Sequence, residues 1–185
     1  MKILIWPGSL RQGSLNRKLA RAIDAKLFER GVETDHIDFR DYDMPLYDGD
    51  IEADQGLPAA TTALAEKISN CDGLVLVTPE YNFGVPGPVK NAIDWMSRIK
   101  PYPTTGKTCF LASAAPGLVG GGRGLIALRP TLSFMGAWLV PDSFSLAQAG
   151  QAFGEDGGLV SEDIDNMLDG MLDQFLAAAE SLKLS

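Results

Sequence analysis

The chain has 185 residues, 45% of them hydrophobic, and a formal net charge of −8. This length and apolar content suffice for one buried core, so we expect a single domain over residues 1–185. The acidic balance, without long runs of one charge, argues against general binding to nucleic acid or an anionic membrane surface. Only four apolar residues stand together before Pro7, too few for a signal peptide or a membrane span, so we predict a cytoplasmic location.

The first strand and the loop after it form the most informative stretch. Residues 3–6 are apolar, and residues 7–16 (PGSLRQGSLN) place two glycines among serine, arginine and asparagine donors before a helical pattern. Glycines let the backbone approach a ligand closely, and the first N–H groups of a helix are free to bind an anion. The loop therefore predicts a phosphate site, with a polar turn that binds nothing as the alternative.

Two better-known glycine loops fit this stretch poorly. Gly8 and Gly13 have the Walker A spacing, but Ser14 stands where that motif has lysine. A dinucleotide fingerprint needs a third glycine at the position of Leu10, although Asp38 lies where its ribose-binding acid would be. A dinucleotide site therefore stays a weaker competitor.

The chain continues as alternating strands and helices. We predict a helix from Leu15 to about Gly31, a strand over 33–39, a helix over 58–70 and a strand over 73–77. The last strand is apolar on both faces, which is typical of a parallel sheet covered by helices on both sides. Residues 40–56 are acidic and rich in turn residues, so we expect a solvated loop in which residues 44–47 cover a neighbouring element or a partner subunit.

Two more loops follow strands in the second half. Residues 78–88 (TPEYNFGVPGP) precede a helix over 89–96, and the small residues of 113–122 follow a strand over 109–112. The next helix, over 125–135, contains Pro130, which should kink it or end its first part. A fifth strand over 137–140, a long loop over 141–159 and a last helix capped by Ser161 complete the pattern.

No titratable residue outside the loops indicates chemistry. His36, the only histidine, lies inside the second strand and is interpreted as structural. Cys71 and Cys109 lack a CxxC partner and are expected to be buried, reduced thiols. The acids of residues 41–54 lack the spacing of a calcium loop, and no metal site is predicted.

This pattern predicts a flavodoxin-like α/β fold, a doubly wound five-stranded parallel sheet in the order 2-1-3-4-5 with helices on both faces. Ligands on such sheets bind outside the carboxyl ends of the strands where the order reverses, here strands one and three. A ligand with a phosphate at one end and a flat ring at the other would span both loops, and FMN has this form. Backbone groups of the second loop would meet the ring edge, and small residues of the third would leave room beside it. The residues expected there are Pro79, Glu80, Tyr81, Asn82, Phe83, Gly84, Ser113, Ala114 and Gly117.

Three motifs also carry a family resemblance. They are GSLRQGSLN at 8–16, MPLYD at 44–48, and TPEYN at 78–82 with PGPVKNAIDW at 86–95. Together they resemble the NADPH-dependent FMN reductase family, especially its bacterial quinone and chromate reductase branch. The resemblance implies that the FMN phosphate is bound by Ser9, Arg11, Ser14, Leu15 and Asn16. It implies that the ring is bound by Pro79, Glu80, Tyr81 and Asn82, with Ser113 or Ala114 completing the pocket.

The implied activity is that of an enzyme, an NAD(P)H-dependent FMN or quinone reductase. NADPH or NADH would reduce the flavin and leave before an acceptor enters, in a ping-pong cycle of hydride transfers. The expected acceptors are quinones, free flavins, azo dyes or oxidised metals, and the expected assembly is a homodimer or homotetramer. We assign no general acid or base, since the three loops offer no isolated His, Cys or Lys.

Two other functions stay open at this point. A flavodoxin-type one-electron carrier would suit the acidic charge, but such a carrier encloses its flavin between aromatics where these loops have glycine and proline. A flavin-free dinucleotide-binding protein would be colourless when purified.

Overall fold

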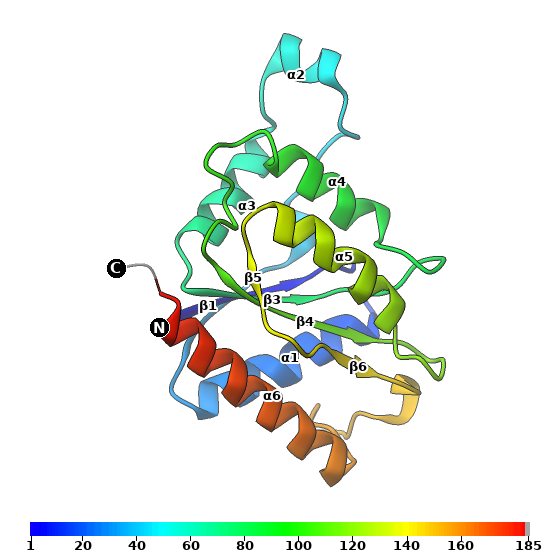
Figure 1. Cartoon of the computed structure of the whole chain (residues 1–185). Coiled ribbons are helices and arrows are strands. Elements are labelled where there is room, and N and C mark those ends of the chain that lie inside the picture. The colour runs from blue at the N-terminus through cyan, green and yellow to red at the C-terminus, as the bar shows by residue number, and fades with distance from the viewer. Residues whose placement is uncertain (184–185) are drawn as a thin grey trace.

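The computed structural model describes residues 1–183, in which one parallel sheet lies between two layers of helices (Figure 1). The strands are β1 (Lys2–Pro7), β2 (Glu33–His36), β3 (Gly73–Val77), β4 (Thr108–Ala114), β5 (Trp138–Leu139) and β6 (Phe144–Leu146). The α-helices are α1 (Leu15–Glu29), α2 (Gly49–Gln55), α3 (Ala59–Ser69), α4 (Gly87–Met96), α5 (Gly122–Phe134) and α6 (Glu162–Ser181). Two 3₁₀ turns, η1 (Phe39–Asp41) and η2 (Ala149–Gln151), stand among them.

The sheet has the predicted order, β2-β1-β3-β4-β5, and every pairing is parallel. The number of strands differs from the prediction of five, because the fifth position is split. Leu139 of β5 lies opposite Cys109, and Phe144 of β6 lies opposite Ala112 further along the same edge of β4. Pro141 stands between the two short strands and cannot donate to a ladder hydrogen bond. The predicted loop 141–159 therefore contains a strand and a 3₁₀ turn.

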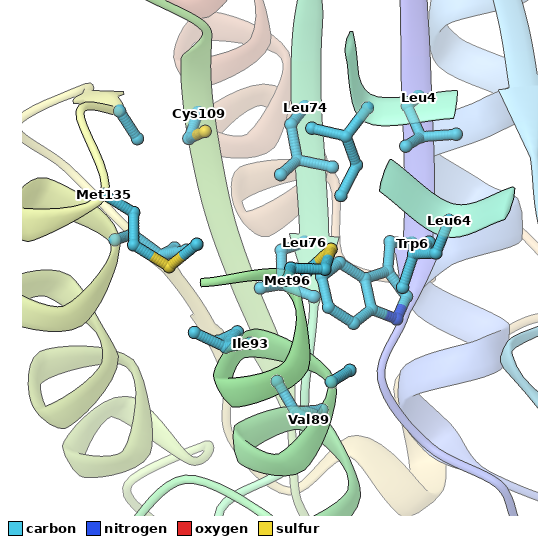
Figure 2. Close-up of a cluster of buried hydrophobic side chains, with 14 of the residues drawn as sticks. Leu4, Trp6, Leu64, Leu74, Leu76, Val89, Ile93, Met96, Cys109 and Met135 are labelled. Atoms are coloured by element: carbon cyan, nitrogen blue, oxygen red, sulfur yellow. The ribbon is translucent and has the colours of Figure 1, made fainter. Parts of the chain in front are cut away.

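Successive side chains of each strand enter opposite layers. Leu4 and Trp6 of β1 pack with Leu74 and Leu76 of β3 against α3, α4 and α5, as Figure 2 shows for part of this cluster. Ile3 and its neighbours on the other face pack against α1 and α6. Burying apolar side chains on both faces contributes roughly 25 cal/mol per Å², which explains why strands as apolar as β3 form the centre of the sheet.

Several boundaries differ from those predicted. The second strand ends at His36, because Asp38 accepts a hydrogen bond from the backbone of Arg40 and begins a turn. Residues 49–55 form α2, capped by Asp48 and projecting from the body of the molecule, where a loop was expected (Figure 1). The strand β4 runs to Ala114, two residues beyond the prediction.

Pro130 does not end α5, which runs from Gly122 to Phe134 as one helix. The proline is exposed, so the carbonyl that loses its backbone donor can face water. Leu125, Leu128 and Leu132 anchor the helix on both sides of it in the core. Within residues 1–183, none of the helices is both long and apolar enough to cross a membrane.

Candidate functional site

The first loop turns from β1 into α1 directly against the start of α4. The N–H of Gly8 donates to the carbonyl of Val77 at 2.8 Å, and a Cβ on Gly8 would lie 2.6 Å from Cγ2 of Val89. Glycine is required at this position because the backbone of the loop lies close to α4. Ser14 then caps α1, accepting the N–H of Asn16 on its Oγ at 3.1 Å. The loop is thereby held with the N-terminus of α1 at the carboxyl end of β1.

Asn16 joins the first loop to the third. Its Nδ2 donates to the carbonyl of Ala114 at 2.8 Å, and its Oδ1 accepts the N–H of Ala114 at 2.9 Å. The side chain is 3% exposed, so both bonds are shielded from water. The family resemblance implied a phosphate ligand at Asn16, which stays a prediction; in the structure its amide ties the start of α1 to the end of β4.

The second loop begins with a tight turn. The backbones of Tyr81 and Gly84 exchange two hydrogen bonds, of 3.1 and 3.0 Å, around Asn82 and Phe83. Both central residues have positive φ, 49° for Asn82 and 66° for Phe83, as a type I′ turn requires. The turn leaves the side chains of Tyr81, Asn82 and Phe83 exposed beside the carboxyl end of β3.

Glu80 connects this turn to α5. Its Oε2 accepts the N–H of Gly124 at 3.0 Å, in the first turn of a helix whose N-cap is a glycine without a side-chain donor or acceptor. Its Oε1 lies 3.9 Å from a guanidinium nitrogen of Arg123, and only 14% of its side chain is exposed. The carboxylate of Glu80 thus caps α5, and the contact of this residue with a flavin ring, expected through its backbone, stays a prediction.

Glycines allow the third loop to pack closely against neighbouring segments of the chain. Ser113 is fully buried, and its Oγ donates to the carbonyl of Gly120 at 2.7 Å. A Cβ on Gly120 would lie 2.7 Å from the backbone of Ser145, and a Cβ on Gly121 would lie 2.9 Å from Oγ of Ser113. Gly117 lies at the exposed tip of this loop. The predicted site residues thus come together at one edge of the sheet, beyond β1, β3 and β4.

A comparison with protein families identifies the family of this chain. Residues 1–151 match the family described as NADPH-dependent FMN reductase. The chain belongs to the NADPH-dependent FMN reductase family. It is therefore an NAD(P)H-dependent oxidoreductase that uses FMN, as its sequence motifs indicated.

Individual relatives of this reductase agree with that assignment. The quinone reductase of Escherichia coli K12 is 36% identical over 174 residues, which cover 94% of this chain and 86% of the relative. A 2-hydroxy-1,4-benzoquinone reductase of Burkholderia sp is 32% identical over 182 residues, or 96% and 95% of the two chains. The solved structure of FerB, a flavoenzyme NAD(P)H:(acceptor) oxidoreductase of Paracoccus denitrificans, matches with a TM-score of 0.86 at 29% identity, over 99% of each chain.

The donor set of the first loop of the reductase fits a phosphate monoester. Ser9 and Ser14 are each 3% exposed, residues 8–16 contain no carboxylate, and Arg11 supplies an exposed cation. The N-terminal N–H groups of a 15-residue helix point toward the same place. Gly8 lets the loop pack against Val89 and Thr78, where a Cβ would clash, and so fixes the path of the backbone that carries these donors.

A cavity of about 450 Å³ borders the first loop of the reductase at Leu10. It lies between residues 39–46 and the start of α4, and residues 79–84 do not line it. Residues 44–47 cover α4, since the indole nitrogen of Trp95 donates to the carbonyl of Pro45 at 2.8 Å. The expectation that they cover a neighbouring element is confirmed.

Sequence reasoning missed Arg123. The run of glycines before α5 was recognised as a small-residue loop, but nothing local indicated that the residue after it would face the turn at residues 81–84. The guanidinium of Arg123 lies 4.2 Å from the centre of the Phe83 ring. This contact depends on the capping of α5 by Glu80, which joins segments more than forty residues apart.

Proposed function

We propose that this protein passes two electrons from NAD(P)H to quinones or similar small acceptors, with FMN bound across the three loops. The overall reaction would be NAD(P)H + H⁺ + quinone → NAD(P)⁺ + quinol. The observation that carries the proposal is the clamp between Asn16 and Ala114, which holds the phosphate-type donors of the first loop beside the end of β4 and the third loop. The quinone reductases of E. coli and Burkholderia among its relatives support this acceptor class.

FMN, when bound, would supply the hydride-accepting and hydride-donating chemistry. The hydroxyls of Ser9 and Ser14, with the N–H groups of α1, would hold its phosphate. Backbone groups of residues 79–82 would orient the ring, and the small residues of the third loop would keep one face accessible. One accessible face would serve NAD(P)H and the acceptor in turn, which favours a ping-pong order. The cytoplasm stays the predicted location.

The decisive experiment is an anaerobic titration of the purified protein. We expect FMN bands that bleach on addition of NADPH or NADH and return with benzoquinone, and parallel double-reciprocal lines in steady-state kinetics. A protein that binds no added FMN would contradict the assignment of the loops. Bleaching without sustained quinone turnover would instead indicate a one-electron carrier.

A matched pair of variants tests the clamp. Asn16→Asp keeps the shape of the side chain but replaces the donor to Ala114 with a carboxylate oxygen. We expect the Kd for FMN to rise about tenfold or more, since a lost hydrogen bond and a nearby negative charge each cost about 1 kcal/mol or more. Asn70→Asp, at the exposed end of α3, is the control and should leave the Kd within about twofold. Equal Kd values for both variants would contradict the proposed phosphate site.

We also propose that the protein forms a homo-oligomer through the outer face of α5. Four large apolar side chains on or beside this helix are more than half exposed: Leu118, Ile126, Phe134 and Trp138. An exposed apolar surface of this kind is typical of protein interfaces. A second copy seated there would lie next to the third loop and the turn at residues 81–84.

A further inference from the structure

Phe83 has an unfavourable backbone conformation without the burial that would offset it. Its φ is +66°, in the left-handed region that favours glycine and asparagine, and bulky residues there are outliers. The ring is 69% exposed, so packing contributes little. Asn82 before it suits the turn, and glycine at position 83 would complete the common Asn-Gly form. Strain of this kind concentrates at functional sites, so the contacts of the Phe83 ring are candidates for a functional role.

The ring of Phe83 contacts a cation. The guanidinium of Arg123 lies 4.2 Å from the ring centre, within the range of a cation–π contact. The side chain of Arg123 is 46% exposed, and its one carboxylate neighbour within the described residues, Glu80, is 3.9 Å away. The carboxylate of Glu80 also accepts the N–H of Gly124, so its charge is shared with the N-terminus of α5. Arg123 therefore keeps donors and positive charge for a ligand.

The position of the pair is set by close contacts on both sides. A Cβ on Gly124 would lie 3.1 Å from Cα of Glu80 and from the carbonyl oxygen of Gly84. A Cβ on Gly121 would lie 2.9 Å from Oγ of Ser113. These glycines hold α5 against the second and third loops, so Phe83 and Arg123 stand beside the proposed ring site. The arrangement combines an aromatic face with a fork of N–H donors.

We propose that Phe83 and Arg123 form a subsite that selects planar acceptors carrying a negative charge, of which an ionised hydroxyquinone is the model. This inference rests on the proposed function and names its substrate class. The flat acceptor would pack against the Phe83 ring, and its anionic oxygen would accept hydrogen bonds from the guanidinium. A net charge of −8 repels anions from the molecule as a whole, so an anionic acceptor needs a local cation at the site.

The test compares two acceptors with the same ring system. 2-Hydroxy-1,4-naphthoquinone is ionised at neutral pH and 1,4-naphthoquinone is neutral, and each is assayed with the FMN-loaded protein at saturating NADH. Arg123→Gln should lower the ratio of kcat/KM for the anionic over the neutral quinone about tenfold, mainly through KM. Arg21→Gln removes the same charge from the exposed face of α1, in the opposite layer, and should leave the ratio within about twofold.

Two further measurements separate recognition from a structural role. The dissociation constant of the anionic quinone, read from the flavin spectrum without reductant, should rise about tenfold in Arg123→Gln and rise less in Arg123→Lys. Added salt should weaken binding of the anion to the native protein more than to Arg123→Gln. Flavin content, measured in each variant, should be unchanged.

The outcomes are distinguishable. If the native protein reduces both quinones and Arg123→Gln lowers both equally, or neither, the subsite is wrong while the reductase function stands. If the native protein reduces neither quinone with NADH or NADPH, the proposed function itself fails. A lowered ratio with an unchanged dissociation constant would also overturn the subsite, because recognition must appear in binding.

Discussion

Two arginines converge on one carboxylate just after β2. Arg17 of α1 donates to both oxygens of Asp38, at 2.7 and 2.8 Å, and Arg40 donates to the same group. Hydrogen bonds from Arg17 and then from Arg40 hold the pKa of Asp38 well below its ordinary value. These contacts leave little room for a ribose hydroxyl, so the acid that kept a dinucleotide site open in the sequence is used to tie β2 to α1.

Asp38→Asn tests this assignment through pH. Because the folded-state pKa is depressed, the ionised carboxylate stabilises the fold above its unfolded pKa of about 4, and the effect is lost as pH falls through the folded-state value. We expect the variant to unfold with about 1–2 kcal/mol less free energy at pH 7, and the deficit to shrink below about pH 4. Urea denaturation at several pH values measures it. Asp41→Asn, an exposed neighbour, is the control, and a deficit that is constant down to pH 3 would contradict the mechanism.

At the scale of elements, α1 and α6 cover one face of the sheet and are joined by a ladder of ion pairs. Lys26 contacts Asp165 at 2.8 Å and Asp169 at 2.9 Å, and Arg30 contacts Asp169 and Asp173. The spacing of i, i+4 on each helix places these charges in register. Lys26 is only 13% exposed at its side chain, so its pairs are shielded from solvent more than usual surface pairs.

Lys26→Met should therefore destabilise the protein more than an ordinary surface substitution. Methionine keeps the apolar stem but removes the cation that contacts both Asp165 and Asp169, so we expect about 1–2 kcal/mol less free energy of unfolding. Lys90→Met breaks the exposed pair with Asp94 on α4 and should cost about 0.5 kcal/mol or less. Urea denaturation of both variants provides the comparison. Equal effects would show that the burial of Lys26 adds nothing.

At the scale of the whole molecule, exposed apolar side chains gather on and beside α5. Ile126 and Phe134 lie eight residues apart on α5, which places them on one side of the helix, and Trp138 follows in β5. Leucines on the opposite side of α5 are buried in the core. A helix that is apolar on both sides needs a second partner, and this is the basis of the proposed homo-oligomer.

Light scattering after gel filtration measures the assembly. We expect the native protein at a multiple of 19.8 kDa and the double variant Ile126→Glu, Phe134→Glu at the mass of one chain, because charges at an apolar interface are costly. Phe28→Glu changes an equally exposed phenylalanine on α1 and should leave the mass unchanged. A native mass of 19.8 kDa would contradict the proposal.

The sequence predicted most elements because their signals are local. Apolar runs indicated β1 and β3, a helical pattern from Leu15 and a capping serine at position 161 marked the starts of α1 and α6, and alternation of strands and helices indicated the sheet order. The prediction failed where contacts with other residues decided the end of a strand or helix. Asp38 ended a strand that periodicity extended, and the core contacts of α5 carried a helix past Pro130.

By itself, the sequence determined the fold, the family and the three loops that form the candidate site, since glycine spacing and helix caps act over a few residues. Only the tertiary structure decided the partners of those residues. In the tertiary structure the amide of Asn16 is hydrogen-bonded to Ala114, the carboxylate of Glu80 accepts a hydrogen bond from α5, and the ring of Phe83 contacts Arg123. These contacts join segments 40 to 98 positions apart, and no local pattern encodes such distances, because they arise from the order in which parallel strands meet at one edge of the sheet.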